Sequence, residues 1–224
     1  MGSVRHCKED ALNAREFEHL LEGAYQIPTP RDFDARFVIL LAGRLGLRGG
    51  EIAHMKESWI NWRKQRIEIP RYERCEKGKD GGICGYCKQQ CLQMAEADTP
   101  TTYEEAKETM WSPKNENAAR KIPFDASTRA AIMVDRYFER FDEYPFCRQA
   151  INRRVNSATK RAPQLRLKRV YPHALRATAA TFWAGKGLDI FALQGMMGWE
   201  MLETAQAYIQ NSGEHTARKM RQLG

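Results

Sequence analysis

The sequence predicts a mainly helical domain with a small antiparallel β-sheet. Apolar residues recur at helical spacing over most of the chain, including almost everything after Ala126. Only two segments, INWRKQRIEIP from Ile60 and MWSPKNENAARKIPF from Met110, combine strand-like alternation with a polar turn. The 224 residues, 42% hydrophobic and 29% charged, suit one large globular domain with room for a small insertion.

Two helices and a shorter helical turn are predicted in the N-terminal part. Residues 11–24 place apolar side chains on one face, with Asn13 as a possible N-cap. Residues 31–46 repeat large apolar side chains at helical spacing, and Gly46 reads as the C-cap of what we expect to be the most buried helix. A Gly-Gly pair then precedes a helical turn that carries Glu51.

The middle of the chain is predicted to hold the sheet and an insertion. INWRKQRIEIP predicts a hairpin that turns at WRKQ. Residues 74–100 are rich in Cys, Gly and Gln and lack periodicity, so we expect an inserted loop module that interrupts the domain without ending it. MWSPKNENAARKIPF then predicts two short strands around a polar turn, with Lys114 in or beside that turn.

The remainder of the chain is predicted to be helical. The predicted helices span residues 127–141, 148–161, 172–186, 189–197, 204–210 and 214–223.

The charge balance favours an acidic partner. Lys and Arg number 36 against 28 Asp and Glu, which gives a formal net charge of +8 and a pI near 9.2. Residues 148–169 carry eight basic side chains and no acid, which suits sequence-neutral contacts to phosphate groups. The chain has no run of eighteen apolar residues and its start, MGSVRHCKED, lacks an apolar region, so we expect a soluble cytoplasmic protein without a membrane partner.

One helix start has the chemistry of a phosphate site. His173 and Arg176 lie three residues apart at the beginning of the helix predicted over 172–186, so both side chains project from one face of its first turn. The N-terminus of a helix favours an anion. This geometry suits a phosphate group.

These residues belong to a larger ordered set. Arg48 follows the predicted buried helix, Lys114 marks the polar turn, and Tyr208 lies 32 residues after Arg176 and nine after Trp199. The set resembles the tyrosine recombinases, the phage integrase family. GLRGGEI is similar to the first arginine box of that family, YPHALRATAATFWAGKG to its HxxR box, and LQGMMGWEMLETAQAYI to its closing segment. The resemblance extends from about Leu12 to Gln210.

The resemblance implies a role for each residue of the set. Arg48 and Arg176 are the expected phosphate-clamping pair, since guanidinium forks neutralise the non-bridging oxygens of a phosphodiester better than lysine does. Tyr208 is the expected nucleophile, and Trp199 the expected indole donor to a phosphate oxygen. His173 is either the base or a phosphate donor, and Lys114 is the expected general acid. Two further residues compete for the acid role: Arg120 and Lys121.

The resemblance also implies a fold and an activity. Residues 1–224 are expected to form a tyrosine recombinase catalytic domain that cleaves and rejoins double-stranded DNA through a 3'-phosphotyrosyl link and acts as a homotetramer on paired sites. No cofactor is expected for this chemistry. No N-terminal core-binding domain is evident, so the chain is either a minimal recombinase or part of a longer protein. The alternatives are relaxation of DNA in the manner of a type IB topoisomerase, and a non-catalytic DNA-binding protein that contains zinc.

Four of the six cysteines form a local cluster. Cys75, Cys84, Cys87 and Cys91 are separated by eight, two and three residues, a spacing that suits tetrahedral zinc, with free or disulfide-paired cysteines as the alternative. The stretch ERCEKGKDGGICGYC is similar to inserts in the integrases of haloarchaea and their viruses, which predicts an archaeal or viral source.

Overall fold

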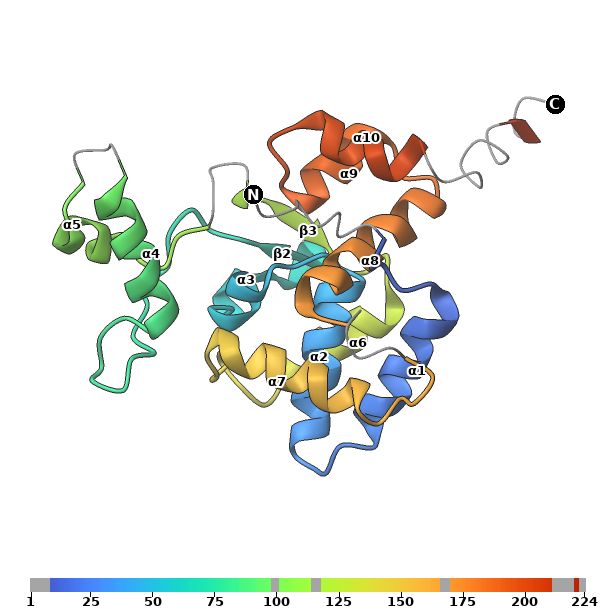
Figure 1. Ribbon diagram of the computed structural model, residues 1–224, viewed down its shortest axis with the longest axis horizontal. Helices are drawn as coiled ribbons and strands as arrows, with labels where there is room; N and C mark the ends of the chain where they lie inside the picture. The colour runs from blue at the N-terminus through green and yellow to red at the C-terminus, as the bar shows by residue number, and fades with distance from the viewer. Residues whose placement is uncertain (1–8, 98–100, 114–117, 166–169, 211–219, 222–224) are drawn as a thin grey trace.

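A central helix organises the fold. The computed structural model describes residues 9–97, 101–113, 118–165, 170–210 and 220–221, and helix α2 (Arg31–Gly43) runs through the middle of its helical body (Figure 1). Helix α1 (Ala14–Tyr25) begins at the predicted cap, where Asn13 and Glu16 form a capping box. Ten residues of α2 are buried because α1 and three later helices pack around it. These helices are α6 (Thr128–Phe138), α7 (Arg148–Thr159) and α8 (Pro172–Gly185).

The sheet has three short antiparallel strands in the order β1–β2–β3. After a short 3₁₀ helix, η1 (Glu57–Trp59), strands β1 (Ile60–Asn61) and β2 (Arg66–Glu68) form the predicted hairpin, whose turn contains a second one, η2 (Trp62–Lys64). β3 (Lys121–Pro123) pairs with β2. Ile67 therefore lies between Ile60 on one side and Ile122 on the other, and all three side chains are buried.

The second predicted hairpin is confirmed only in its β3 arm. No strand is assigned to residues 110–113, the described residues before the turn, although Trp111 exchanges two backbone hydrogen bonds with Glu73. The turn itself, with Lys114, lies at 114–117, outside the described residues.

The insertion at 74–100 is not an irregular loop. It contains helix α4 (Gly85–Glu96), which packs against α5 (Tyr103–Glu108), and the two helices project from one side of the body (Figure 1). The prediction of a structureless module was wrong because the buried positions of α4 are Cys87 and Cys91 rather than large apolar residues. Helix α4 therefore lacks the buried Leu, Ile or Phe at helical spacing by which a helix is usually predicted.

The C-terminal helices form a second, smaller core on α8. Helices α9 (Ile190–Met197) and α10 (Leu202–Gln210) bury Leu193, Met197 and Ala205 against Ala180 and Ala184 of α8. The helix predicted over 214–223 falls outside the described residues except for two helical positions, 220 and 221.

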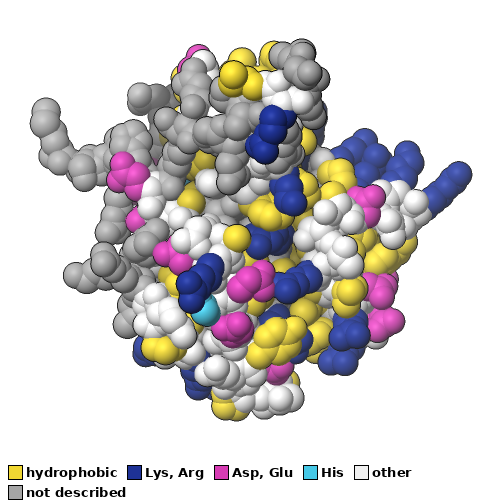
Figure 2. Space-filling view, turned by 90° about the vertical axis from the view of Figure 1, so that its right-hand side faces the viewer, with side chains coloured by type: hydrophobic (Ala, Val, Ile, Leu, Met, Phe, Trp, Pro, Cys, Tyr) yellow, Lys and Arg dark blue, Asp and Glu magenta, His cyan; other side chains and the backbone are white. Residues whose placement is uncertain are grey.

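The surface has the usual mixture of side chains. On the face in Figure 2, basic and acidic groups are interspersed among hydrophobic ones, which is typical of a solvated surface. None of the helices in the described ranges is long and apolar enough to span a bilayer.

Candidate active site

A tight turn after α2 positions Arg48. Gly46 adopts a φ of 67°, a left-handed conformation that favours glycine, and a Cβ at this position would displace the Met197 sulfur, which lies 2.5 Å away. Arg48 is then the N-cap of helix α3 (Gly49–Ala53), and its backbone N–H donates to Glu51 Oε2 at 2.7 Å. Its guanidinium donates to Glu51 Oε1 at 3.0 Å and to the Gly198 carbonyl at 2.7 Å. The Gly-Gly pair thus starts a helix rather than separating two.

Arg176 enters the same place from α8. Pro172 occupies the first turn of that helix, as the sequence predicted, and Arg176 lies one turn later with only 3% of its surface exposed. Its guanidinium donates to the carbonyls of Gly46 and Met197. Burial, followed by the charges of Arg48 and Arg120, lowers the pKa of Arg176 well below its usual range. A bound anion would stabilise this cation.

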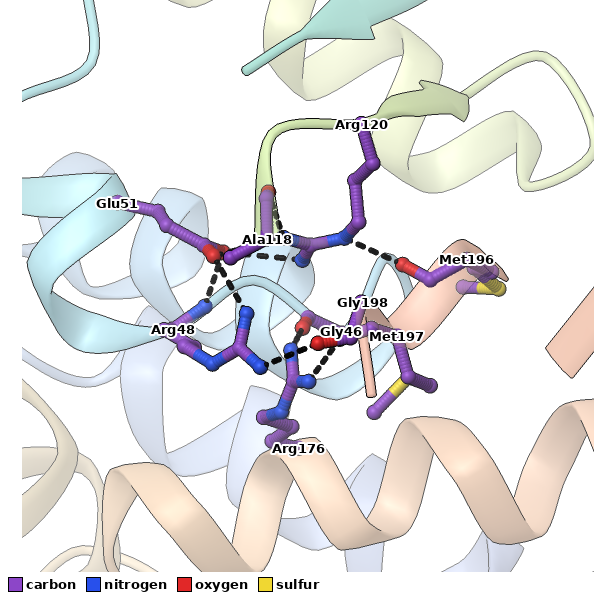
Figure 3. Close-up of polar contacts among 9 residues, drawn as sticks. All are labelled: Gly46, Arg48, Glu51, Ala118, Arg120, Arg176, Met196, Met197 and Gly198. Carbon is purple, nitrogen blue, oxygen red and sulfur yellow. Dashed lines mark hydrogen bonds and ion pairs between the residues drawn. The ribbon is translucent and has the colours of Figure 1, made fainter. Parts of the chain in front are cut away.

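One buried carboxylate bonds two arginines and lies within electrostatic range of a third. Glu51 is 1% exposed and accepts two hydrogen bonds from Arg120, at 2.7 and 3.0 Å, in addition to those from Arg48 (Figure 3). Burial alone would raise the pKa of Glu51, but Arg120, Arg176 and Arg48 lower it to about 2. Three guanidiniums therefore face a single negative charge.

Backbone carbonyls balance part of that excess. Arg120 donates through Nε to Met196 at 2.6 Å and through Nη1 to Ala118 at 2.8 Å (Figure 3). Together with the bonds from Arg48 and Arg176, these contacts tie the end of α9 to α3 and α8. In this network the Nε, Nη1 and Nη2 groups of Arg120 all donate to buried partners, which disfavours Arg120 as a general acid. Lys121, the other competitor, is exposed on β3.

A cleft of about 590 Å³ opens over this network. Arg48, His173, Arg176 and Trp199, four of the predicted site residues, line it together. The other lining residues include Tyr86, Trp111, Arg148, Asn152 and Tyr171. The structure therefore brings residues from α3, α4, α7, α8 and the α9–α10 connection to one cavity whose floor carries net positive charge.

Tyr208 stands directly behind Trp199. The two rings are stacked, with centroids 5.2 Å apart and planes 15° from parallel, and the Arg176 guanidinium carbon lies 5.9 Å from the Trp199 ring centre. Tyr208 is half-buried on α10 and its phenol acts electrostatically on Arg176. The predicted nucleophile is thus one aromatic ring away from the cleft and belongs to the same chain as the arginines.

The predicted acid, Lys114, falls among the residues that the structure leaves undescribed. Ser112 and Pro113, which immediately precede it, line the cleft. The described part of the chain therefore reaches the edge of the cleft one residue before Lys114.

A second group of reactive side chains lies beside the cleft. Cys75, Cys84 and Cys87 are gathered with His54, and their ligand atoms all lie within 4.8 Å of one another. Cys91, the fourth predicted ligand, stands outside this group. It follows Cys87 by one turn of α4, where burial raises its pKa.

Comparison with known proteins decides the family. A sequence profile of the phage integrase family matches residues 10–215. The chain belongs to this family. No curated protein matches it.

Solved structures of integrases and recombinases share the fold. The Tn1549 transposon integrase in complex with a circular intermediate DNA is 17% identical, with a TM-score of 0.63 over 96% of this chain and 66% of that one. XerA recombinase is 18% identical, with a TM-score of 0.58 over 95% of this chain and 63% of that one. XerH bound to a palindromic difH substrate is 17% identical, with a TM-score of 0.57 over 94% and 52%. This integrase-family chain thus spans less than two thirds of each of these chains, and the predicted catalytic-domain fold is confirmed.

The sequence revealed some residues of the site only in part or not at all. The position of Glu51, three residues after Arg48, suited either a carboxylate that orients an arginine or histidine or an exposed helical acid, and the structure shows it bonded to two arginines. Arg120 had been considered only as an acid. Tyr86 and Arg148, whose guanidinium lies 4.7 Å from the Tyr86 ring centre, come from the insert and α7. No local pattern announces such a pair, because only the tertiary fold brings it to the cleft.

Proposed function

We propose that this chain cleaves and rejoins double-stranded DNA at specific sites, with Tyr208 as the nucleophile. The observation that carries the proposal is the convergence of Arg48, Arg176 and His173 in one cleft, with Tyr208 stacked behind Trp199 at its edge. These groups come from separate elements. Their meeting at a buried cationic floor is what phosphoryl transfer requires.

The reaction follows from these groups. The Tyr208 oxygen attacks the scissile phosphorus, His173 accepts the phenolic proton or donates to a phosphate oxygen, and the bond to the 5' oxygen breaks. Arg48 and Arg176 stabilise the charge on the non-bridging oxygens. Lys114 gives a proton to the leaving 5' oxygen. A 5' hydroxyl from another strand then reverses the attack, so the ester bond is conserved and the chemistry needs neither ATP nor a metal.

The described contacts support attack within one subunit. Helix α10 packs on α8 and α9 of its own chain, and the Tyr208 phenol lies within electrostatic range of its own Arg176. Reaching a phosphate in the cleft requires the Tyr208 ring to leave Trp199, which is a local movement of α10. Trp199 then supplies an indole N–H to the phosphate.

The wider role is inferred from the relatives. The integrase and recombinase structures named above include complexes with a circular intermediate DNA and with a palindromic difH substrate. For this chain we propose double-stranded DNA as substrate, a homotetramer on paired sites, integration of mobile or viral DNA as the biological outcome, and action in the cytoplasm. An archaeal or viral source remains a prediction from the insert.

A covalent-trapping assay tests the function. The protein is incubated with nicked duplexes, taken as a random-sequence pool and as the DNA beside its gene, so that the cleaved end diffuses away and the adduct accumulates. We expect an adduct that is lost in Tyr208→Phe. Binding without adduct would instead support a non-catalytic DNA-binding protein, and relaxation of plasmid DNA without site preference would support a topoisomerase.

A further inference from the structure

Four buried groups from separate segments meet beside the active site. His54 is the C-cap of α3, Cys75 follows β2, and Cys84 and Cys87 begin α4. Each is at most 4% exposed. Three thiols and one imidazole are a common ligand set of structural zinc.

The separations within the group fit one tetrahedral ion. With Zn–S near 2.3 Å and Zn–N near 2.05 Å, tetrahedral geometry places a sulfur and a nitrogen ligand about 3.5 Å apart. The His54 Nε2 atom lies 3.6 Å from Cys84 Sγ and 3.4 Å from Cys87 Sγ. The described cysteines are all free, so none of these sulfurs is in a disulfide. A disulfide between two of them would leave the His54 ring facing two sulfurs that are bonded to each other.

The surrounding hydrogen bonds orient the ligands. His54 Nδ1 lies 2.8 Å from the Gly50 carbonyl, which only accepts, so the proton is on Nδ1 and the Nε2 lone pair faces the three sulfurs. The Cys84 backbone N–H donates to Cys75 Sγ at 3.4 Å. Hydrogen bonds of this kind hold metal ligands in the orientation that an ion requires.

We propose that His54, Cys75, Cys84 and Cys87 bind one Zn²⁺ ion, and that this ion fixes the insert to the helix that follows the catalytic Arg48. Cys91 is not a ligand. The zinc site is independent of the proposed function, whereas the effect of the ion on the active site rests on it.

The link to the active site runs through His54. Its ring stacks on Trp111, with centroids 5.2 Å apart and planes 12° from parallel, and Trp111 lines the cleft three residues before Lys114. Its Nδ1 contact holds Gly50, which lies between Arg48 and Glu51. The Tyr86 ring, on the insert, lies against the same glycine: a Cβ at Gly50 would meet it at 3.2 Å.

A second tether restrains the insert. Lys77 donates to the carbonyl of Ala53 at 2.8 Å and also to that of Tyr144. Because Ala53 directly precedes His54, the first contact holds the insert at the end of α3, and the second holds it to the segment between α6 and α7. Without the ion, these bonds of Lys77 and the contacts of Tyr86 with Gly50 and Arg148 are among the described connections between the insert and the body.

The metal half is tested by composition and spectroscopy. We expect about one zinc per chain in reduced, purified protein. Cys91→Ala, the matched control, should contain the same amount of zinc, whereas His54→Ala and Cys87→Ser should lose most of it. Cobalt exchanged into the unaltered protein should give a charge-transfer band with the intensity of three Co–S bonds. Four such bonds, loss of zinc in Cys91→Ala, or no zinc in the unaltered protein would overturn the assignment.

The coupling half is tested on the unaltered chain. Zinc is removed with a chelator and then restored, and the rate of covalent DNA adduct formation is measured at each stage, with circular dichroism as the check on folding. We expect removal to slow the adduct about tenfold to a hundredfold, as a displacement of reacting groups does, and restoration to recover it. An unchanged rate overturns the coupling. A zinc-loaded protein that forms no adduct means that the proposed function has failed, while the zinc and thiolate counts still decide the site.

Discussion

The Glu51→Gln substitution removes the charge that three arginines share. In the folded protein Glu51 accepts four hydrogen bonds, two from Arg48 and two from Arg120, at 2.7 to 3.0 Å. The glutamine amide has nearly the same shape as the carboxylate. Its NH2 group, however, would point N–H bonds toward a guanidinium, which also only donates. Removal of one partner from a buried ion pair costs about 3–5 kcal/mol.

The lowered pKa of Glu51 gives a second value for the free energy of this interaction. A shift from 4.5 to about 2 corresponds to roughly 3 kcal/mol of stability at neutral pH. Because the folded pKa is below the unfolded one, this stability is present above pH 4.5 and is lost as the pH falls toward 2. Glu51→Gln should lack this acid-dependent loss, since it has no proton to bind.

Urea denaturation measures the effect. With a slope of about 2 kcal/mol per molar urea, a loss of about 4 kcal/mol lowers the midpoint by about 2 M. A midpoint shift below about 0.5 M in Glu51→Gln would refute the reasoning.

Three further outcomes are expected. Arg176→Lys loses the guanidinium fork that we propose binds the scissile phosphate, so adduct formation should slow by about 10²-fold to 10³-fold in single-turnover assays while filter binding of DNA persists; an unchanged rate would contradict the clamp. A mixture of Tyr208→Phe with Arg176→Ala should form no adduct if each subunit uses its own tyrosine, whereas recovery of activity would indicate attack on a neighbour's phosphate. Trp199→His retains a ring N–H donor and should keep more adduct than Trp199→Phe, which lacks one; equal rates would remove that role.

The predicted residues that meet in the cleft could be singled out in the sequence because their signals are local. His173 and Arg176 share a helix turn, and the Gly46 turn places Arg48 at the next helix, so short motifs carry their geometry. Periodicity likewise predicted α1, α2, α6, α7 and α8, whose buried faces are apolar in sequence.

The remainder depended on tertiary contacts. The cysteine spacing drew attention to Cys91, yet the fold brings His54 to the cluster from 21 residues before Cys75, and no spacing rule joins those two positions. The bond from Arg120 to Glu51 spans 69 residues. Helix α4 was missed because cysteines took the positions that large apolar residues usually occupy.

The most direct test of the account is to identify the residue that DNA modifies. The trapped adduct is digested with nuclease and protease, and the peptide that retains a 3'-linked nucleotide is sequenced by mass spectrometry. The account predicts one modified side chain, Tyr208, and no modification in Tyr208→Phe. A nucleotide on any other residue, or an adduct that survives that substitution, would contradict it.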